Sequence, residues 1–260
     1  MSIITLTSDF GGNDPFFGIM KGVILTICPD ARIEDITHDI SPQNIWQANF
    51  IIQASYHYFP KGTIHVCVVD PGVGSERKPI LIESKNYFFI GPDNGIFTGI
   101  LEKEDITNAI ELTEKKYWLP NVSQTFHGRD IFSPVAGYLA GGINSNAFGK
   151  KIKKEDLTSL PMKKPIKNKN GFKGIIQYID HFGNLITNIP NEGTPDKITG
   201  KIMDISFNGL VSSFGDANNK GLTAIKGSSG YIELFIYKDN AKLRTGVKIG
   251  NDLEISFVVQ

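Results

Sequence analysis

The most constraining feature of this sequence is a run of seven residues, TIHVCVV at positions 63–69, in which nearly every side chain is apolar. Short runs of this kind are typical of parallel strands that are covered on both faces. Shorter β-branched runs occur at 3–7 and 33–36, and they alternate with segments of helical spacing at 16–27 and 45–59. This alternation predicts an α/β domain in which helices layer a mostly parallel sheet.

The second half of the chain has a different pattern. Its strand-like runs are separated by Gly and Asn, without a convincing helix between them, at 174–179, 185–189, 202–207, 231–236 and 253–259. This pattern predicts a small antiparallel β-barrel. Positions 150–169 hold eight lysines and few apolar residues, which indicates a solvated linker rather than a nucleic-acid patch, because no aromatic residues interleave the charges. We therefore predict an N-terminal α/β domain over 1–160 and a C-terminal β-barrel domain over 161–260.

Charge and composition restrict the partners of the chain. Lys and Arg together number 27, as do Asp and Glu, so no net field attracts nucleic acid or an anionic membrane. The first residues, MSIITLTSDF, lack the features of a signal peptide, and no apolar run approaches the ~20 residues of a membrane span. The two cysteines, Cys28 and Cys67, lie in apolar stretches and are interpreted as buried thiols. We expect a cytoplasmic protein that acts on a small molecule.

Carboxylates follow three of the expected strands. Asp9, Asp70 and Asp93 each stand where a strand ends, and ligands of open parallel sheets bind beyond those ends. We expect the three to converge on one crevice. In the loop VVDPGVGSER, Asp70 and Arg77 can pair across two glycines, either as part of a site or as an ordinary surface ion pair. The loop is not a phosphate-binding P-loop, because no Gly-Lys-Ser/Thr follows.

His127 is the histidine with the best candidate position, in TFHGRDIF just before an expected helix at 131–140. An imidazole there can orient a water molecule or exchange a proton with it near neutral pH. Together with Asp9, Asp70, Asp93 and Asp130 it could instead ligate a divalent ion. No HExxH or CxxC motif supports that alternative, so we expect no metal.

Six motifs in consistent order then resemble one family: SDFG at 8–11, MKG at 20–22, VDPGVGSER, GPDNG, FHGRDIF and IDHFGNLITNI. Together they are similar to the S-adenosylmethionine hydroxide adenosyltransferases, the hydrolytic relatives of the fluorinase and chlorinase enzymes. The resemblance implies an α/β domain joined to a β-barrel. It also implies a homotrimer, with each site between the N-terminal domain of one subunit and the C-terminal domain of its neighbour.

The resemblance assigns roles by position. Asp70, Arg77 and His127 match the residues that activate water, and Asp9 matches the carboxylate that accepts both ribose hydroxyls. Further substrate-binding positions lie in the C-terminal domain, for the methionine ammonium, the adenine and the methionine carboxylate: Asp180, Phe182, Asn184, Ser228, Ser229 and Ala241. The expected reaction is hydrolysis of S-adenosylmethionine to adenosine and methionine. S-adenosylmethionine is then the substrate, and no cofactor is expected.

Departures from the halogenating relatives favour water as the nucleophile. Those enzymes carry Tyr at the position of Asp70, a halide-binding Ser at Gly128 in the fluorinase, and Arg at Ser229. A carboxylate at Asp70 repels an anion, and Gly128 offers no hydroxyl to a halide. A halogenase of the same fold and a non-catalytic S-adenosylmethionine sensor stay as alternatives. A methyltransferase is disfavoured, because no Gly-x-Gly-x-Gly turn follows the first strand.

Overall fold

A computed structural model describes residues 2–217 and 221–258. The chain forms two compact units, the first ending at Leu160 and the second beginning at Pro161. Within the described residues, no helix combines the length and the apolar character that a membrane crossing requires.

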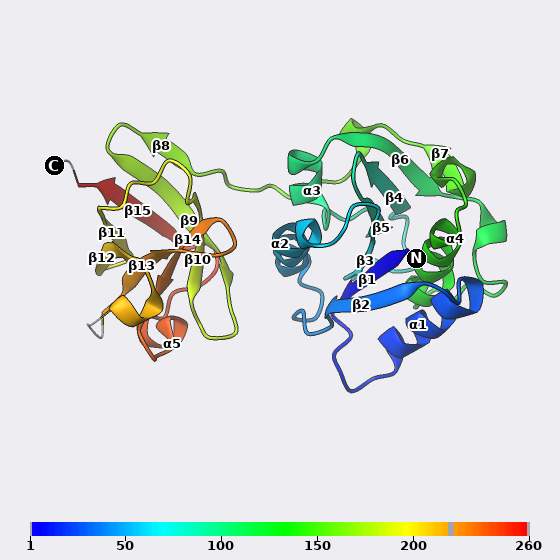
Figure 1. Ribbon diagram of the computed structural model, residues 1–260, viewed down its shortest axis with the longest axis horizontal. Coiled ribbons are helices and arrows are strands. Elements are labelled where there is room, and N and C mark those ends of the chain that lie inside the picture. The colour runs from blue at the N-terminus through cyan, green and yellow to red at the C-terminus, as the bar shows by residue number, and fades with distance from the viewer. Residues whose placement is uncertain (1, 218–220, 259–260) are drawn as a thin grey trace. The chain divides into compact units, whose positions relative to one another are not determined.

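The N-terminal unit is built on one sheet with the strand order β2-β1-β3-β5-β4-β6-β7 (Figure 1). The strands are β1 (Ile3–Ser8), β2 (Arg32–Thr37), β3 (Ile64–Val68), β4 (Pro79–Ser84), β5 (Phe88–Pro92), β6 (Ile106–Leu112) and β7 (Gly149–Lys151). The four strands β2, β1, β3 and β5 are parallel, whereas β4 runs antiparallel to β5 and β6, and β7 runs antiparallel to β6. The expected mostly parallel sheet is confirmed.

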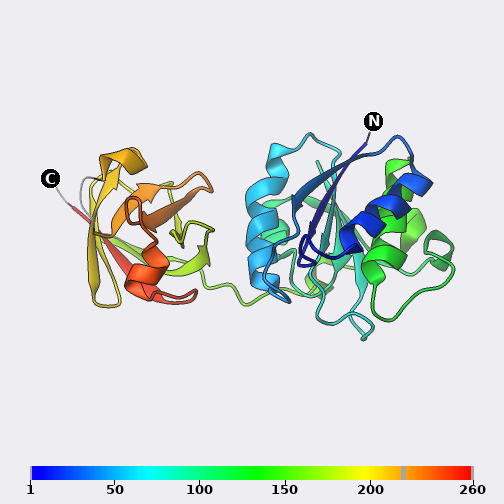
Figure 2. The ribbon, with the colours of Figure 1, turned by 90° about the horizontal axis from the view of Figure 1, so that it is seen from below.

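Helices cover both faces of this sheet, in two layers that Figure 2 shows edge-on. They are α1 (Phe16–Ile27) and α4 (Ser133–Ala140) in one layer, and α2 (Ile45–Ser55) and α3 (Thr98–Lys103) in the other. Strand β3 contributes side chains to the cores on both faces of the sheet. Val66 and Val68 pack with α1 and α4, whereas Cys67 packs with α2 and α3. Because successive side chains of a strand point to opposite faces, a strand between two helical layers must be apolar throughout.

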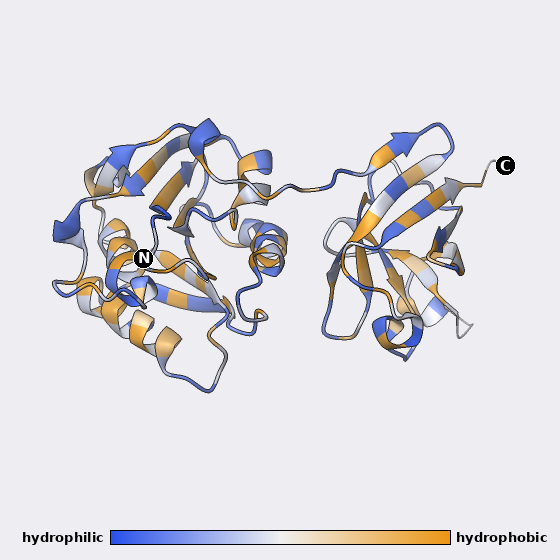
Figure 3. Ribbon diagram, turned by 180° about the vertical axis from the view of Figure 1, so that it is seen from behind, coloured by the Kyte–Doolittle hydropathy of each residue, from blue (hydrophilic) through white to orange (hydrophobic). Residues whose placement is uncertain are grey.

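The C-terminal unit is a closed barrel of seven strands, ordered β10-β14-β13-β12-β11-β15-β9, with β9 also pairing with β10. A short strand β8 adds to β9 outside the ring. The strands are β8 (Ile166–Asn168), β9 (Gly171–Ile179), β10 (Leu185–Pro190), β11 (Ile198–Ile202), β12 (Ile205–Val211), β13 (Thr223–Lys226), β14 (Tyr231–Phe235) and β15 (Asp252–Phe257). All described pairs are antiparallel except β12–β13, which is parallel. Figure 3 shows hydrophobic and hydrophilic residues alternating along these strands. The inward-facing apolar side chains form the main core of the barrel, and a smaller apolar cluster lies around Phe235.

Two sequence expectations need correction. The lysine-rich segment is not a linker over its whole length: β7 pairs with β6, and Leu157 is buried in the core beside α2 and α3. Its lysines are exposed, but the chain up to Leu160 is folded onto the first unit, and β8 of the second unit pairs with β9, which composition alone does not reveal. The barrel also carries one short helix, α5 (Ala241–Thr245), which is too brief to give a helical period.

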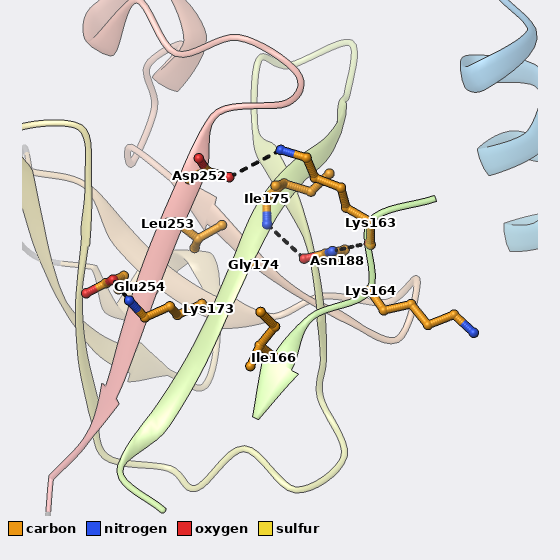
Figure 4. A pocket seen from close by; sticks show the side chains of 10 residues that line it. All are labelled: Lys163, Lys164, Ile166, Lys173, Gly174, Ile175, Asn188, Asp252, Leu253 and Glu254. Atoms are coloured by element: carbon orange, nitrogen blue, oxygen red, sulfur yellow. Dashed lines mark hydrogen bonds and ion pairs between the residues drawn. The ribbon is translucent and has the colours of Figure 1, made fainter. Parts of the chain in front are cut away.

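Asn188 on β10 fixes the chain where it enters the barrel. Its side-chain Oδ1 accepts a hydrogen bond from Ile175 N at 2.9 Å, and its Nδ2 donates to Lys163 O at 2.8 Å (Figure 4). The side chain is 7% exposed. A groove of about 530 Å³ beside it is lined by residues of β9 and β15 and by Lys163 and Lys164 of the entering chain, and none of the expected site residues lies there.

Candidate active site

Asp9 and Asp70 lie side by side because they follow neighbouring parallel strands. Ser8 at the end of β1 is paired with Val68 at the end of β3, so the residues that follow both strands emerge at the same edge of the sheet. Both carboxylates line a crevice of about 230 Å³. Asp9 is held there by the backbone of Gln43, whose N–H donates to Asp9 Oδ2 at 2.7 Å.

Asp70, Arg77 and His127 form one hydrogen-bonded group. Arg77 Nε donates to Asp70 Oδ1 at 3.0 Å, and Arg77 Nη2 donates to Asp70 Oδ2 at 2.5 Å. The same Nη2 lies 2.7 Å from His127 Nδ1. The side chains of Arg77 and Asp70 are 9% and 6% exposed, so this is not an ordinary surface ion pair.

Two loops bring His127 to this pair, and Gly74 holds the loops together. Gly74 has φ +78°, and a Cβ there would lie 2.4 Å from Gln124 O, so only glycine allows this approach. Behind His127 the chain makes a π-turn at Gly128–Phe132 that continues into α4. The buried Asp130 in that turn accepts a hydrogen bond from Ser123 N at 2.8 Å. The position of the imidazole is therefore set by backbone contacts of both loops.

The contact with Arg77 also determines the protonation of His127. A guanidinium can only donate, so Nδ1 of His127 accepts from Arg77 and the ring hydrogen resides on Nε2. Burial, and then the positive charge of Arg77, lower the pKa of His127. The imidazole is thus a neutral donor through Nε2–H and a weak base.

Asp93 does not join the crevice, contrary to the expectation from its strand-end position. Its Oδ1 accepts a hydrogen bond from Thr158 N at 2.8 Å, so the carboxylate fixes the end of the first unit instead. Asp130 likewise pairs with Arg129. Within residues 2–217 and 221–258, no three His, Cys, Asp or Glu side chains are grouped so as to hold a metal ion.

The turn between β9 and β10 presents a second set of the expected residues. Asp180 Oδ1 accepts from Asn184 N at 2.8 Å, and Asp180 Oδ2 accepts from Asn184 Nδ2 at 3.0 Å. Gly183, with φ +86°, lets the turn lie against Asn240 at the start of α5. Phe182 is 73% exposed at the tip of the turn, which is unusual for a large aromatic ring and favours a stacking role over a core role.

A cavity of about 700 Å³ opens beside this turn. Four of the predicted substrate-binding residues line it together: Asp180, Phe182, Asn184 and Ser228. Ser229 and Ala241 are not among its lining residues. The Ser229 hydroxyl is buried without a hydrogen-bond partner, and Ala241 is fully buried in the barrel core, because it is the first residue of α5 and faces inward.

Two residues of these sites were not expected from the sequence. Gln43 holds Asp9 through its backbone, in a left-handed conformation with φ +66°, and no side-chain pattern marks such a role. Glu233 lines the cavity of the barrel and is 8% exposed. A signal for Glu233 was present: it is a single acid inside the apolar run YIELFI, where an ionisable group is costly unless it has a function.

Comparison with known families gives two matches that together span most of the chain. Residues 4–149 match the SAM hydroxide adenosyltransferase N-terminal domain, and residues 174–254 match the SAM hydroxide adenosyltransferase C-terminal domain. The matched ranges fall within the α/β unit and the barrel, respectively.

Individual relatives agree with this match. The chain is 36% identical to an (R)-S-adenosyl-L-methionine hydrolase from Methanocaldococcus jannaschii, over 99% of the chain and 97% of the relative. A protein of the same name from Thermus thermophilus is 29% identical over 96% of the chain and 98% of the relative. A fluorinase from Actinoplanes sp. is 27% identical over 72% of the chain and 71% of the relative. Among solved structures, an uncharacterized conserved protein from Thermotoga maritima superposes with a TM-score of 0.90 at 32% identity, covering 97% of this chain and 99% of that one.

Proposed function

Because the chain belongs to the SAM hydroxide adenosyltransferase family, we propose that it hydrolyses S-adenosylmethionine to adenosine and L-methionine. The observation that carries this proposal is the hydrogen-bonded group of Asp70, Arg77 and His127, which lies at the crevice that also contains Asp9. The hydrolase relatives are named for the R epimer at sulfur, and we propose the same epimer for this chain.

In the proposed reaction, Asp9 binds the ribose. A carboxylate has two oxygens, each able to accept more than one hydrogen bond, so it can receive both hydroxyls of a vicinal diol while Oδ2 keeps its contact with Gln43 N. Ribose bound there would direct its 5′ carbon toward Asp70 and His127, which line the same crevice. Holding the reacting atoms in line can lower the barrier by as much as about 7–11 kcal/mol in ideal cases.

The water molecule would be positioned rather than deprotonated before it attacks. His127 offers Nε2–H, and its Nδ1 is already occupied by Arg77, so it is unsuited to take a proton. As the water oxygen bonds to the 5′ carbon, the carbon–sulfur bond breaks and its electron pair leaves with the neutral thioether of methionine. The attacking oxygen becomes strongly acidic at that stage. The Asp70 carboxylate can then accept its proton, and no cofactor is needed.

The methionine and adenine ends of the substrate belong, in this proposal, to the barrel cavity beside Asp180 and Asn184. Phe182 would stack on adenine. Asn184 donates its amide hydrogen to Asp180, which leaves Asn184 Oδ1 to accept from the adenine amino group. Following the family resemblance, we propose a homotrimer in which the N-terminal unit of one subunit and the barrel of its neighbour share each substrate molecule. Light scattering of the purified protein tests that assembly.

Halogenation is the alternative that the fluorinase relatives raise. Two features of this chain favour water. The Asp70 carboxylate lines the crevice and would repel a halide, and a Cβ at Gly128 would lie 3.2 Å from both Met20 Sδ and the Phe126 ring, so a serine there would be crowded. A sensor that only binds S-adenosylmethionine is the other alternative, and it would not require the Asp70, Arg77 and His127 arrangement.

One experiment separates these functions. Purified protein is incubated with each epimer of S-adenosylmethionine, with and without chloride, and the nucleoside products are separated by chromatography. Adenosine formed at the same rate with and without chloride supports hydrolysis. A 5′-chloro-nucleoside that requires chloride would identify a halogenase, and tight binding measured by calorimetry without any product would identify a sensor.

A further inference from the structure

A network of four polar side chains lies behind the turn that carries Asp9, and the function proposed above does not use it. Ser8 Oγ lies 2.7 Å from His38 Nδ1, and His38 Nε2 lies 3.1 Å from Asp35 Oδ1. Lys21 Nζ completes the network, 2.5 Å from Asp35 Oδ2. Ser8 and His38 are 2% and 9% exposed, whereas Asp35 and Lys21 are partly exposed. The network therefore runs from the surface of α1 and β2 to the residue that precedes Asp9.

The links of this network have defined donors. A carboxylate only accepts, so in a neutral ring His38 Nε2 carries the hydrogen that faces Asp35, and Nδ1 accepts from the Ser8 hydroxyl. Ser8 Oγ in turn accepts from Phe10 N at 3.4 Å. Burial opposes the charge of Asp35, but the contacts from Lys21 and His38 outweigh it and lower the pKa of this carboxyl. An ionised Asp35 near neutral pH therefore sets the orientation of the imidazole.

The backbone that begins at His38 closes the turn from its other side. Gly11 N donates to His38 O at 2.8 Å, so the residues on both sides of Asp9 and Phe10 contact His38. Further along the same segment, Gln43 N donates to Asp9 Oδ2 at 2.7 Å. The place of the Asp9 carboxylate thus depends on where His38 lies.

Helix α1 fixes the plane of the His38 ring. The ring of Phe17 stacks on it, with centroids 4.1 Å apart and planes 13° apart. Lys21 Nζ lies 5.3 Å from the centroid of the same Phe17 ring. Positions 17 and 21 are neighbours on one helix face, so α1 presents the ring and the ammonium together. The network therefore gives a role to Lys21 in the MKG motif and to Ser8 in the SDFG motif.

A second hydroxyl–imidazole pair on β1 shows what this network adds. Thr5 Oγ1 lies 2.7 Å from His65 Nδ1, and both side chains are fully buried. Within residues 2–217 and 221–258, His65 Nε2 has no hydrogen-bond partner, and burial lowers the pKa of His65 to about 3. Its ring stacks on Phe89 in the core. The Thr5 pair is thus a packing contact, whereas the Ser8 pair continues to a charged carboxylate and lies next to Asp9.

We propose that His38 is a positioning residue for the ribose, which holds the Ser8–Asp9 end of β1 so that the Asp9 carboxylate receives both hydroxyls of the diol. This inference rests on the proposed function and deepens it by assigning the residues that orient its ribose-binding acid. Asp35 and Lys21 act only through His38. Because both hydroxyls must be received at once, a small rotation of Asp9 loses one of the two hydrogen bonds. A hydrogen bond to a charged group is worth about tenfold to a hundredfold in affinity, so the loss is measurable.

The test compares adenosine with 2′,3′-dideoxyadenosine, which lacks both hydroxyls, by calorimetry on the full-length chain. Ser8→Ala removes the hydroxyl that contacts His38, and Thr5→Val, the matched control, removes the hydroxyl of the other pair. We expect the wild type to prefer adenosine by about a hundredfold, and Ser8→Ala to lower this preference about tenfold, whereas Thr5→Val keeps it. Both variants lose one buried hydrogen bond, so urea denaturation should find similar losses of stability in the two.

A second comparison tests whether Ser8 acts through Asp9. Asp9→Asn lowers the diol preference directly, and adding Ser8→Ala to it should lower the preference no further. Additive losses in the double variant would contradict the inference, because independent sites add. Equal losses of affinity for the two nucleosides in Ser8→Ala would make the contact purely structural and overturn the inference, and so would an unchanged preference.

The proposed function is tested separately on the same wild-type sample. A wild type without any preference for the diol would contradict the ribose role of Asp9, and the inference with it. Failure to release adenosine from S-adenosylmethionine, together with a diol preference that Ser8→Ala lowers and Thr5→Val keeps, would contradict hydrolysis and support the positioning role of His38.

Discussion

Replacing Asp70 with asparagine tests the water-positioning group most sharply, because the change keeps the shape and removes the charge. Asparagine has one acceptor oxygen, so Arg77 can keep one of its two contacts, at Nε or at Nη2, and loses the other. Arg77 is 9% exposed and would stay charged. Breaking a buried pair by removing one partner costs about 3–5 kcal/mol, and the retained contact puts this variant near the lower end.

The effect on turnover is expected to exceed the effect on stability. Arg77 Nη2 contacts both Asp70 and His127, so its displacement moves the whole group. A misplacement of about 1 Å costs about 100-fold in rate, and loss of a proton acceptor contributes about another 100-fold or more. We expect kcat to fall by about 10⁴-fold, the product of these two factors, with unchanged affinity for S-adenosylhomocysteine, because Asp9 and the barrel cavity are intact.

Single-turnover release of adenosine, followed by chromatography, measures this rate. Asp93→Asn is the matched control, since Asp93 lies outside the crevice and its Oδ1 contact with Thr158 N survives the change. Circular dichroism establishes that both variants are folded. Adenosine release by Asp70→Asn at the wild-type rate would refute the role of Asp70, and so would a loss explained entirely by weaker ligand binding.

Three further predictions concern pH, the barrel and metal ions. Burial and Arg77 lower the pKa of His127, so kcat at saturating substrate should stay constant from pH 8 down to the ordinary imidazole pKa of about 6.5. It should decline only below that value, where protonation of Nδ1 breaks the contact with Arg77. A decline that begins above pH ~6.5 would contradict the assignment. Asn188→Ala should lower the free energy of unfolding, measured by urea denaturation, by about 1–3 kcal/mol, because two backbone groups lose their hydrogen-bond partner. Asn168→Ala on the exposed edge strand β8 should change this free energy little. Equal effects of the two substitutions would contradict the bridging role of Asn188. Treatment with EDTA should leave adenosine production unchanged, and activity lost to the chelator and restored by a divalent ion would favour metal catalysis.

The layered architecture could be predicted from the sequence because its signals are local. The apolar run at 63–69 must be covered on both faces, and the helical period at 16–27 matches α1. The antiparallel half of the N-terminal sheet has a weaker signal. Strands β4 and β5 form a local hairpin, but the pairings of β4 with β6 and of β6 with β7 join segments that are distant in the sequence. The burial of Leu157 could not be predicted either, because its neighbours in the sequence are mostly charged and its contacts come from the folded sheet and helices.

The candidate site was predictable in part for the same reason. Asp9 and Asp70 follow adjacent parallel strands, so their proximity follows from the strand pattern. His127 lies 50 residues beyond Arg77, and only the family resemblance linked the two before the structure brought them to 2.7 Å. For Ala241 the resemblance gives only a position: its side chain faces the barrel core and does not line the cavity, and a role toward adenine stays a prediction.

Hydrolysis in ¹⁸O-labelled water tests the central claim most directly. Attack on the ribose 5′ carbon transfers the solvent oxygen to the nucleoside, so mass spectrometry should find one ¹⁸O atom in the 5′-hydroxyl of adenosine and none in methionine. Unlabelled adenosine, or 5′-methylthioadenosine accompanied by labelled homoserine, would show that water does not attack at this carbon and would contradict the account.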